Sequence, residues 1–82
     1  MLLNELAMQY DYTVLYEKVA EGGFLVHVPA MPEIVTYGRT RDEAKRMAED
    51  AIRCVLESAR KAGEPIPEDN EPVTERLGVI LA

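Results

Sequence analysis

The carboxylates of this sequence are considered first for chemistry, because acids that converge on metal ions can hydrolyse phosphodiesters. Such a site needs carboxylates from neighbouring elements to meet at one or two metal ions. The segments expected to form strands carry only Asp11, Glu17 and Glu75, which fall at strand ends or on alternating faces. The acids of the long predicted helix lie mostly on its outer side. We therefore expect no catalytic residue and no metal site, and a metal-dependent nuclease is the weakest function considered.

Nucleophilic and phosphate-binding chemistry is equally poorly supported. His27 is the only histidine and has no cysteine near it in the sequence, so it is expected to be a partly exposed strand residue. Cys54 is the only cysteine, which excludes a disulfide, and it is expected to be a small buried hydrophobe. Gly22-Gly23 lacks the lysine and the following helix of a phosphate loop, so it is expected to form a hairpin turn. No cofactor is expected.

The charge pattern disfavours nucleic acid as a direct partner. The formal net charge is −6, which repels a polyanion. The only basic cluster is interleaved with acids, so a solvated helix face is the better interpretation; its members are Arg39, Arg41, Lys45 and Arg46. A negative chain instead suits a basic protein partner, through steering and charge complementarity.

Four residues are the candidates for binding such a partner. Glu17 and Glu21 border a predicted hairpin, and Glu33 extends the acidic side past a segment that we call the proline bracket, Pro29-Ala30-Met31-Pro32. Met31 has two alternatives: an exposed methionine that contacts a partner, or a plug at the edge of the sheet. The two prolines leave this loop little freedom to lose, which lowers the ordering cost of binding there.

A chain of 82 residues is expected to form one domain with a thin core. At this size only about 60–65% of the unfolded surface is buried, so a further stabilising contact is needed. Without a disulfide, homo-oligomerisation, most simply built on dimers, is the expected route. The sequence shows no secretory leader and no apolar run near 20 residues, so we expect a cytoplasmic protein without a membrane span.

One long helix, residues 40–63, should position the rest of the chain. Thr40 and Glu43 form a capping box at its start, and Gly63 followed by Pro65 ends it. Its apolar stripe has helical spacing and is rich in alanine, which suits close packing on a sheet. The stripe consists of Ala44, Met47, Ala48, Ala51, Ile52, Val55, Leu56 and Ala59.

The remaining segments predict an α+β fold. Strands are expected over residues 11–19, 24–28 and 34–37, with the first two joined as an antiparallel hairpin. A short helix is expected over residues 1–10, and a last strand over residues 73–81 after an acidic, proline-rich linker. The single domain 1–82 then has an N-terminal helix (1–10), a core of strands and helix (11–67), and a linker end with a C-terminal strand (68–82). The sheet has three to four antiparallel strands with the main helix on one face.

Residues 12–67 resemble the HicB-like antitoxin family. The resemblance rests on a tyrosine-led first strand, the turn Glu21 to Phe24, the proline bracket, Thr36 to Thr40 before the helix, and the exit Gly63 to Pro67. The family usually has aspartate at the position of Ala30 and glycine at that of Glu33. Full-length members often carry a further DNA-binding module, whereas only 15 residues follow Pro67 here. This chain therefore looks like the HicB-like domain alone.

The resemblance implies a reduced ribonuclease-H-like fold and a non-catalytic antitoxin. Such a protein would occlude a small, basic, mRNA-cleaving HicA-type toxin. A second hypothesis is a HicB-like homo-oligomeric interaction or regulatory module without a toxin. A reading frame for a small basic protein beside the gene would favour the first hypothesis over the second.

Overall fold

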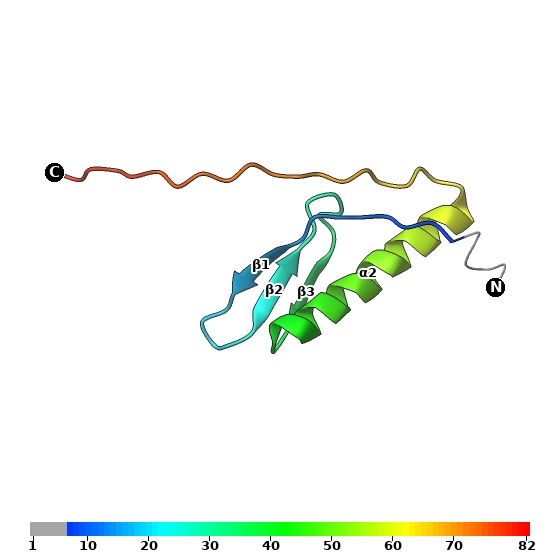
Figure 1. Cartoon of the computed structure of the whole chain (residues 1–82), viewed down its shortest axis with the longest axis horizontal. Helices are drawn as coiled ribbons and strands as arrows, with labels where there is room; N and C mark the ends of the chain where they lie inside the picture. The colour runs from blue at the N-terminus through cyan, green and yellow to red at the C-terminus, as the bar shows by residue number, and fades with distance from the viewer. Residues whose placement is uncertain (1–6) are drawn as a thin grey trace.

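The computed structural model describes residues 7–82, which form three strands and one helix. The strands β1 (Leu15–Lys18), β2 (Phe24–His27) and β3 (Val35–Gly38) make an antiparallel sheet in the order β1-β2-β3. The helix α2 (Arg41–Ala62) packs against β2 and β3 on one face of this sheet (Figure 1). The α+β class and the antiparallel sheet are confirmed. The helix is not long and apolar enough to cross a membrane, and no other helix occurs in residues 7–82.

The turn between β1 and β2 is the predicted glycine hairpin. The amide of Gly22 donates to the carbonyl of Val19 at 2.9 Å, and the amide of Val19 donates to the carbonyl of Gly23 at 3.1 Å. Gly22 and Gly23 have φ values of 109° and 89°, which side-chain-bearing residues rarely adopt. The Tyr37 hydroxyl donates to the Gly22 carbonyl at 2.8 Å, so β3, the strand at the opposite edge of the sheet from β1, also holds the turn.

The caps of α2 are formed as the sequence predicts. The Thr40 hydroxyl accepts from the amide of Glu43, and the Glu43 carboxylate accepts from the amide of Arg39 at 2.6 Å. At the other end, Gly63 is left-handed with φ 68°, and the amide of Glu64 donates to the carbonyl of Ala59 at 2.9 Å. These bonds satisfy groups that a helix end leaves without partners.

Two small clusters make up the core between α2 and the sheet. The first joins Val26 to Ala44 and Ala48, with Val14, Tyr16 and Phe24 packed around it. Tyr16 contacts Phe24 edge-on, and the Arg41 guanidinium lies 4.6 Å from the centre of the Tyr16 ring. The second cluster lies under the proline bracket and consists of Val28, Met31 and Ile34, flanked by Tyr12, Val14, Ala30, Ala51, Ile52, Val55 and Leu56.

Three sequence expectations are corrected here. Residues 7–10 of the predicted N-terminal helix are not helical, and residues 1–6 lie outside the described part of the chain. Residues 73–81 form no strand; they belong to an extended arm, residues 64–82, that projects from the domain (Figure 1). A strand needs a hydrogen-bonded neighbour, and among the described residues 7–82 the arm has none beyond its first residues. Cys54 is exposed. It follows Ile52 by two residues, and two residues rotate a side chain by about 200° around the helix axis, away from the apolar stripe.

Candidate partner-binding surface

The face of the sheet opposite α2 carries mostly apolar side chains, and no helix or strand of residues 7–82 covers it. Side chains alternate along a strand, so the residues that point away from the helix are every second one. Val35 is 58% exposed, a large value for a valine in a strand. We call this surface the outer sheet face; it consists of Leu15, Glu17, Leu25, His27, Val35 and Tyr37.

The strand register arranges the outer sheet face into two rows. Leu15 lies opposite His27, which lies opposite Val35. Glu17 lies opposite Leu25, which lies opposite Tyr37. A single ionisable pair crosses between the rows: His27 Nε2 lies 2.9 Å from Glu17 Oε1. Both side chains are largely exposed, so this pair is screened by water and adds little to stability.

The structure separates the four predicted partner-binding residues. Glu17 lies on the outer sheet face. Glu21 is in the turn after β1 and Glu33 is in the loop after β2, so these two acids lie at opposite ends of the sheet (Figure 1). Met31 is only 1% exposed and fills the core under the proline bracket. Of its two alternatives, burial is the one observed, and its side chain is not available to a partner.

Met31 is buried because the loop around it is tightly turned. The amide of Met31 donates to the carbonyl of Val28, and the amide of Ile34 donates to the carbonyl of Met31, both at 2.9 Å. These two bonds curl the loop so that the side chain points under α2. The proline bracket is thus held both by its prolines and by the buried Met31 side chain. Glu33, the residue that follows the bracket, is exposed to solvent.

Sequence reasoning missed the apolar members of the outer sheet face. Leu15, Leu25 and Val35 were not among the predicted partner-binding residues, although they share one face of the sheet. The signal was present, since both phases of these short strands carry apolar residues, which is typical of a sheet covered on both faces. Tyr37 also belongs here, with its hydroxyl held on the Gly22 carbonyl.

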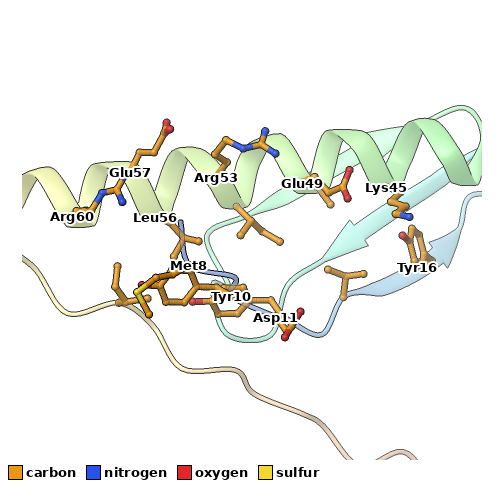
Figure 2. Close-up of a pocket in the computed structure, with 15 residues that line it drawn as sticks. Met8, Tyr10, Asp11, Tyr16, Lys45, Glu49, Arg53, Leu56, Glu57 and Arg60 are labelled. Carbon is orange, nitrogen blue, oxygen red and sulfur yellow. The ribbon is translucent and has the colours of Figure 1, made fainter. Parts of the chain in front are cut away.

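A separate feature of the surface is a groove between α2 and the segment that leads into β1. It is an open groove of about 540 Å³ (Figure 2). Its floor is apolar, with Tyr12 and Val14 on one side and Ile52 and Leu56 on the other. Charged side chains of α2 line its helix side, and these are Lys45, Glu49, Arg53, Glu57 and Arg60 (Figure 2).

The start of the arm is tied to the segment before β1. The Tyr12 hydroxyl donates to the carbonyl of Pro67 at 2.5 Å. Asp69 accepts from the amide of Thr13 at 2.7 Å and from its hydroxyl at 2.9 Å. The hydrogen bond from the Thr13 backbone amide in particular holds the pKa of the Asp69 carboxyl below its usual range. Burial, with smaller contributions from Tyr10 and Asp69, raises the pKa of Tyr12 above its usual value.

The acids considered for catalysis are not gathered by the fold. Within residues 7–82, no group of three or more histidine, cysteine, aspartate or glutamate side chains is placed to hold a metal ion. Glu17 pairs with His27, and Glu75 lies on the projecting arm.

Known proteins similar to this chain include two short ones and one longer one. No protein-family model matches the chain. It is 44% identical over 59 residues to UPF0150 protein Ta0767 of Thermoplasma acidophilum, covering 72% of this chain and 86% of that protein. It is 33% identical over 61 residues to UPF0150 protein ssr1765 of Synechocystis, covering 74% and 77%. It is 45% identical over 56 residues to Antitoxin HicB 1 of Photorhabdus laumondii, covering 68% of this chain but 36% of that longer protein.

Proposed function

This chain belongs to the HicB-like antitoxin family, and we propose that it is a non-catalytic antitoxin that binds and occludes a small, basic, mRNA-cleaving HicA-type toxin. The observation that carries the proposal is the uncovered outer sheet face. Leu15 on β1 and Val35 and Tyr37 on β3 are exposed on this one face, with β2 between the two strands, and exposed apolar patches mark interaction sites. Inhibition would be steric, with the toxin's catalytic surface covered.

Charge supports a basic partner for this face. The chain carries a net charge of −6, which attracts a positive protein and speeds its encounter. Glu17 lies within the outer sheet face, while Glu21 and Glu33 border its two ends. Apolar residues at the centre with acids at the margin reproduce the usual organisation of an interface, with a hydrophobic core and a polar rim.

The loops at the two ends are already ordered, which favours tight binding. The turn at one end is held by the Tyr37 hydroxyl, and the proline bracket at the other is anchored by buried Met31. A partner that contacts Glu21 or Glu33 would therefore order little new backbone. This lowers the entropic cost of association.

The test is a binding titration against any small basic protein that a reading frame beside this chain's gene encodes. Val35→Lys places a positive charge on the outer sheet face, at the edge strand β3, and is expected to weaken binding at least ~10-fold. Met47→Lys is the matched control, because Met47 is an exposed apolar residue of α2, away from that face. Weaker binding by the Met47 variant with unchanged binding by the Val35 variant would refute the assignment.

Charge reversal tests the electrostatic part separately. Glu17→Lys with Glu33→Lys is expected to slow association, and the slowing should shrink as salt is raised. Arg46→Glu with Arg53→Glu on the helix is the comparison pair. Loss of binding in the helix variant alone would move the toxin to the other side of the molecule.

Self-association is the second candidate function, in line with a homo-oligomeric module that has no toxin. The observation that favours it is the arm, on which Val73, Leu77, Val79, Ile80 and Leu81 are all exposed. We propose a dimer as the basic unit, working in the cytoplasm. Light scattering at micromolar concentration tests this directly, and a mass equal to one chain would exclude it.

The absence of catalysis is part of the proposal and is tested on its own. The purified chain is expected to leave RNA intact with and without added magnesium or manganese. Cleavage that needs metal and disappears in a folded Asp11→Asn or Glu17→Gln variant would show that the chain is an enzyme.

A further inference from the structure

We infer that residues 73–81 of the arm pair as a strand with the free edge of β1 in a second copy of this chain. The inference rests on the proposed self-association and adds its geometry. It assigns one occupant to two features that the single chain leaves open: the edge of β1 and the groove beside it.

The arm has the composition of a strand that lacks its sheet. Leu77, Val79 and Leu81 alternate with Arg76, Gly78 and Ile80. Exposure of its large apolar side chains runs from 77% at Leu77 to 97% at Ile80. Five such residues within nine positions are costly to leave in water, and they become favourable only when another surface covers them.

Within residues 7–82 no strand pairs with the outer edge of β1, so this free edge offers unpaired backbone groups. In the hairpin, the amide of Val19 donates to the carbonyl of Gly23. Because the bonding direction alternates along an antiparallel strand, Glu17 and Leu15 also direct their backbone groups toward β2. Tyr16 and Lys18 therefore present theirs at the open edge. An exposed edge of this kind is a template for an added strand.

The groove beside this edge accounts for the side chains of an added strand. It lies between the segment leading into β1 and α2 (Figure 2), and Val14, Ile52 and Leu56 are among the apolar residues that line it. A strand added at the edge directs every second side chain into this space. The Leu77, Val79 and Leu81 set provides three apolar side chains at that spacing, and the groove of about 540 Å³ has room for them.

Ile66 at the start of the arm lines the groove of its own chain, but the apolar end of the arm, residues 73–81, is poorly placed to fill it. Asp69 is bonded to Thr13, and from there the arm runs in the general direction of β1 (Figure 1). Continuing alongside β1 from that contact would set Glu71 near Leu15 and Thr74 near Lys18. The stretch opposite β1 would then contain Pro72, which has no amide to donate to the ladder.

Residues 77–81 would then lie past the end of the sheet. At about 3.3 Å per residue, Leu77 lies roughly 10 Å beyond the position opposite Lys18. Figure 1 shows the arm continuing past the hairpin turn, away from the domain. The apolar part of the arm therefore reaches a neighbouring molecule, and reciprocal exchange by two copies gives a closed dimer.

Two single substitutions in the arm test the exchange. Val79→Glu puts a charge among the side chains that enter the groove, and it should raise the dimer dissociation constant at least ~100-fold because each dimer contains two such sites. Thr74→Glu adds the same charge in the opposite phase of the strand, and it should change that constant less than ~3-fold. Equal effects of the two variants, or none, would overturn the strand exchange.

The location is tested in mixed dimers. An Ala82→Cys, Cys54→Ser chain carrying a nitroxide is mixed with an isotope-labelled Cys54→Ser chain without a spin label. The expected result is broadening of the Tyr16 and Lys18 amides of the labelled chain. A dimer that broadens Val35 and Tyr37 instead, or broadens nothing, overturns the exchange and leaves the proposed self-association intact. A solution mass equal to one chain would exclude both the strand exchange and the proposed self-association.

Discussion

Gly38→Ala is the substitution for which the structure predicts the sharpest result. Gly38 ends β3 where α2 begins, and an added Cβ would lie 2.2 Å from the backbone nitrogen of Ala44 and 2.5 Å from its Cα. Neither atom can rotate away, because both belong to the helix backbone. Ordinary contact would require α2 to move by about 1 Å relative to β3.

That movement acts on the centre of the core. Ala44 is fully buried against Val26, and Ala48 packs beside them. Overpacking of this kind costs about 1–3 kcal/mol, and the backbone clash places Gly38→Ala near the upper end, at ~3 kcal/mol. The total free energy of unfolding for a domain of this size is about 4–12 kcal/mol. The variant should therefore fold, with much of its stability lost.

The assay is urea unfolding followed by circular dichroism. With a slope of about 1 kcal/mol per molar urea for a small domain, the midpoint should fall by ~2–3 M. Gly78→Ala is the matched control, because nothing lies within 4 Å of the Cβ that it adds. A glycine-to-alanine change without a clash is neutral or slightly stabilising, because it restricts the unfolded chain. A loss below ~1 kcal/mol for Gly38→Ala would refute the reasoning about helix–sheet contact.

Other perturbations give results of different kinds. Met31→Ala should cost ~2–5 kcal/mol in urea unfolding, because it empties the space under the proline bracket, whereas Met47→Ala on the exposed side should cost under ~1 kcal/mol. Thr40→Ala should cost ~1 kcal/mol by removing the cap of α2, and an unchanged helix stability would argue against that hydrogen bond. The Asp69 pKa is lowered in the folded chain, so its bonds to Thr13 stabilise the arm above about pH 4 and are lost as the pH falls through the lowered pKa. An NMR titration of the Thr13 amide should show a midpoint below the ordinary aspartate value of 3.8; a midpoint at or above it would contradict the contact.

Several parts of this structure depend only on residues that are neighbours along the chain, and local sequence signals predict them. The capping box of Thr40 and Glu43 and the left-handed Gly63 are local arrangements, and each occurs where the pattern predicts it. The hairpin turn at Gly22-Gly23 is local as well, since positive φ angles are needed within a few residues. The α+β class follows from these signals because one apolar helix stripe and alternating strands require each other.

Which surfaces remain exposed depends instead on contacts between segments that are distant in the sequence. Met31 is buried because the loop curls under α2, a contact between segments that the sequence pattern does not encode locally. The apolar residues Leu15 and Val35 of the outer sheet face are visible in the sequence. Their exposure follows only from the position of α2, which packs on the opposite face of the sheet. Residues 73–81 have the alternation of a strand and still form none, because strand formation needs hydrogen bonds to a second segment, and no other part of residues 7–82 lies alongside them.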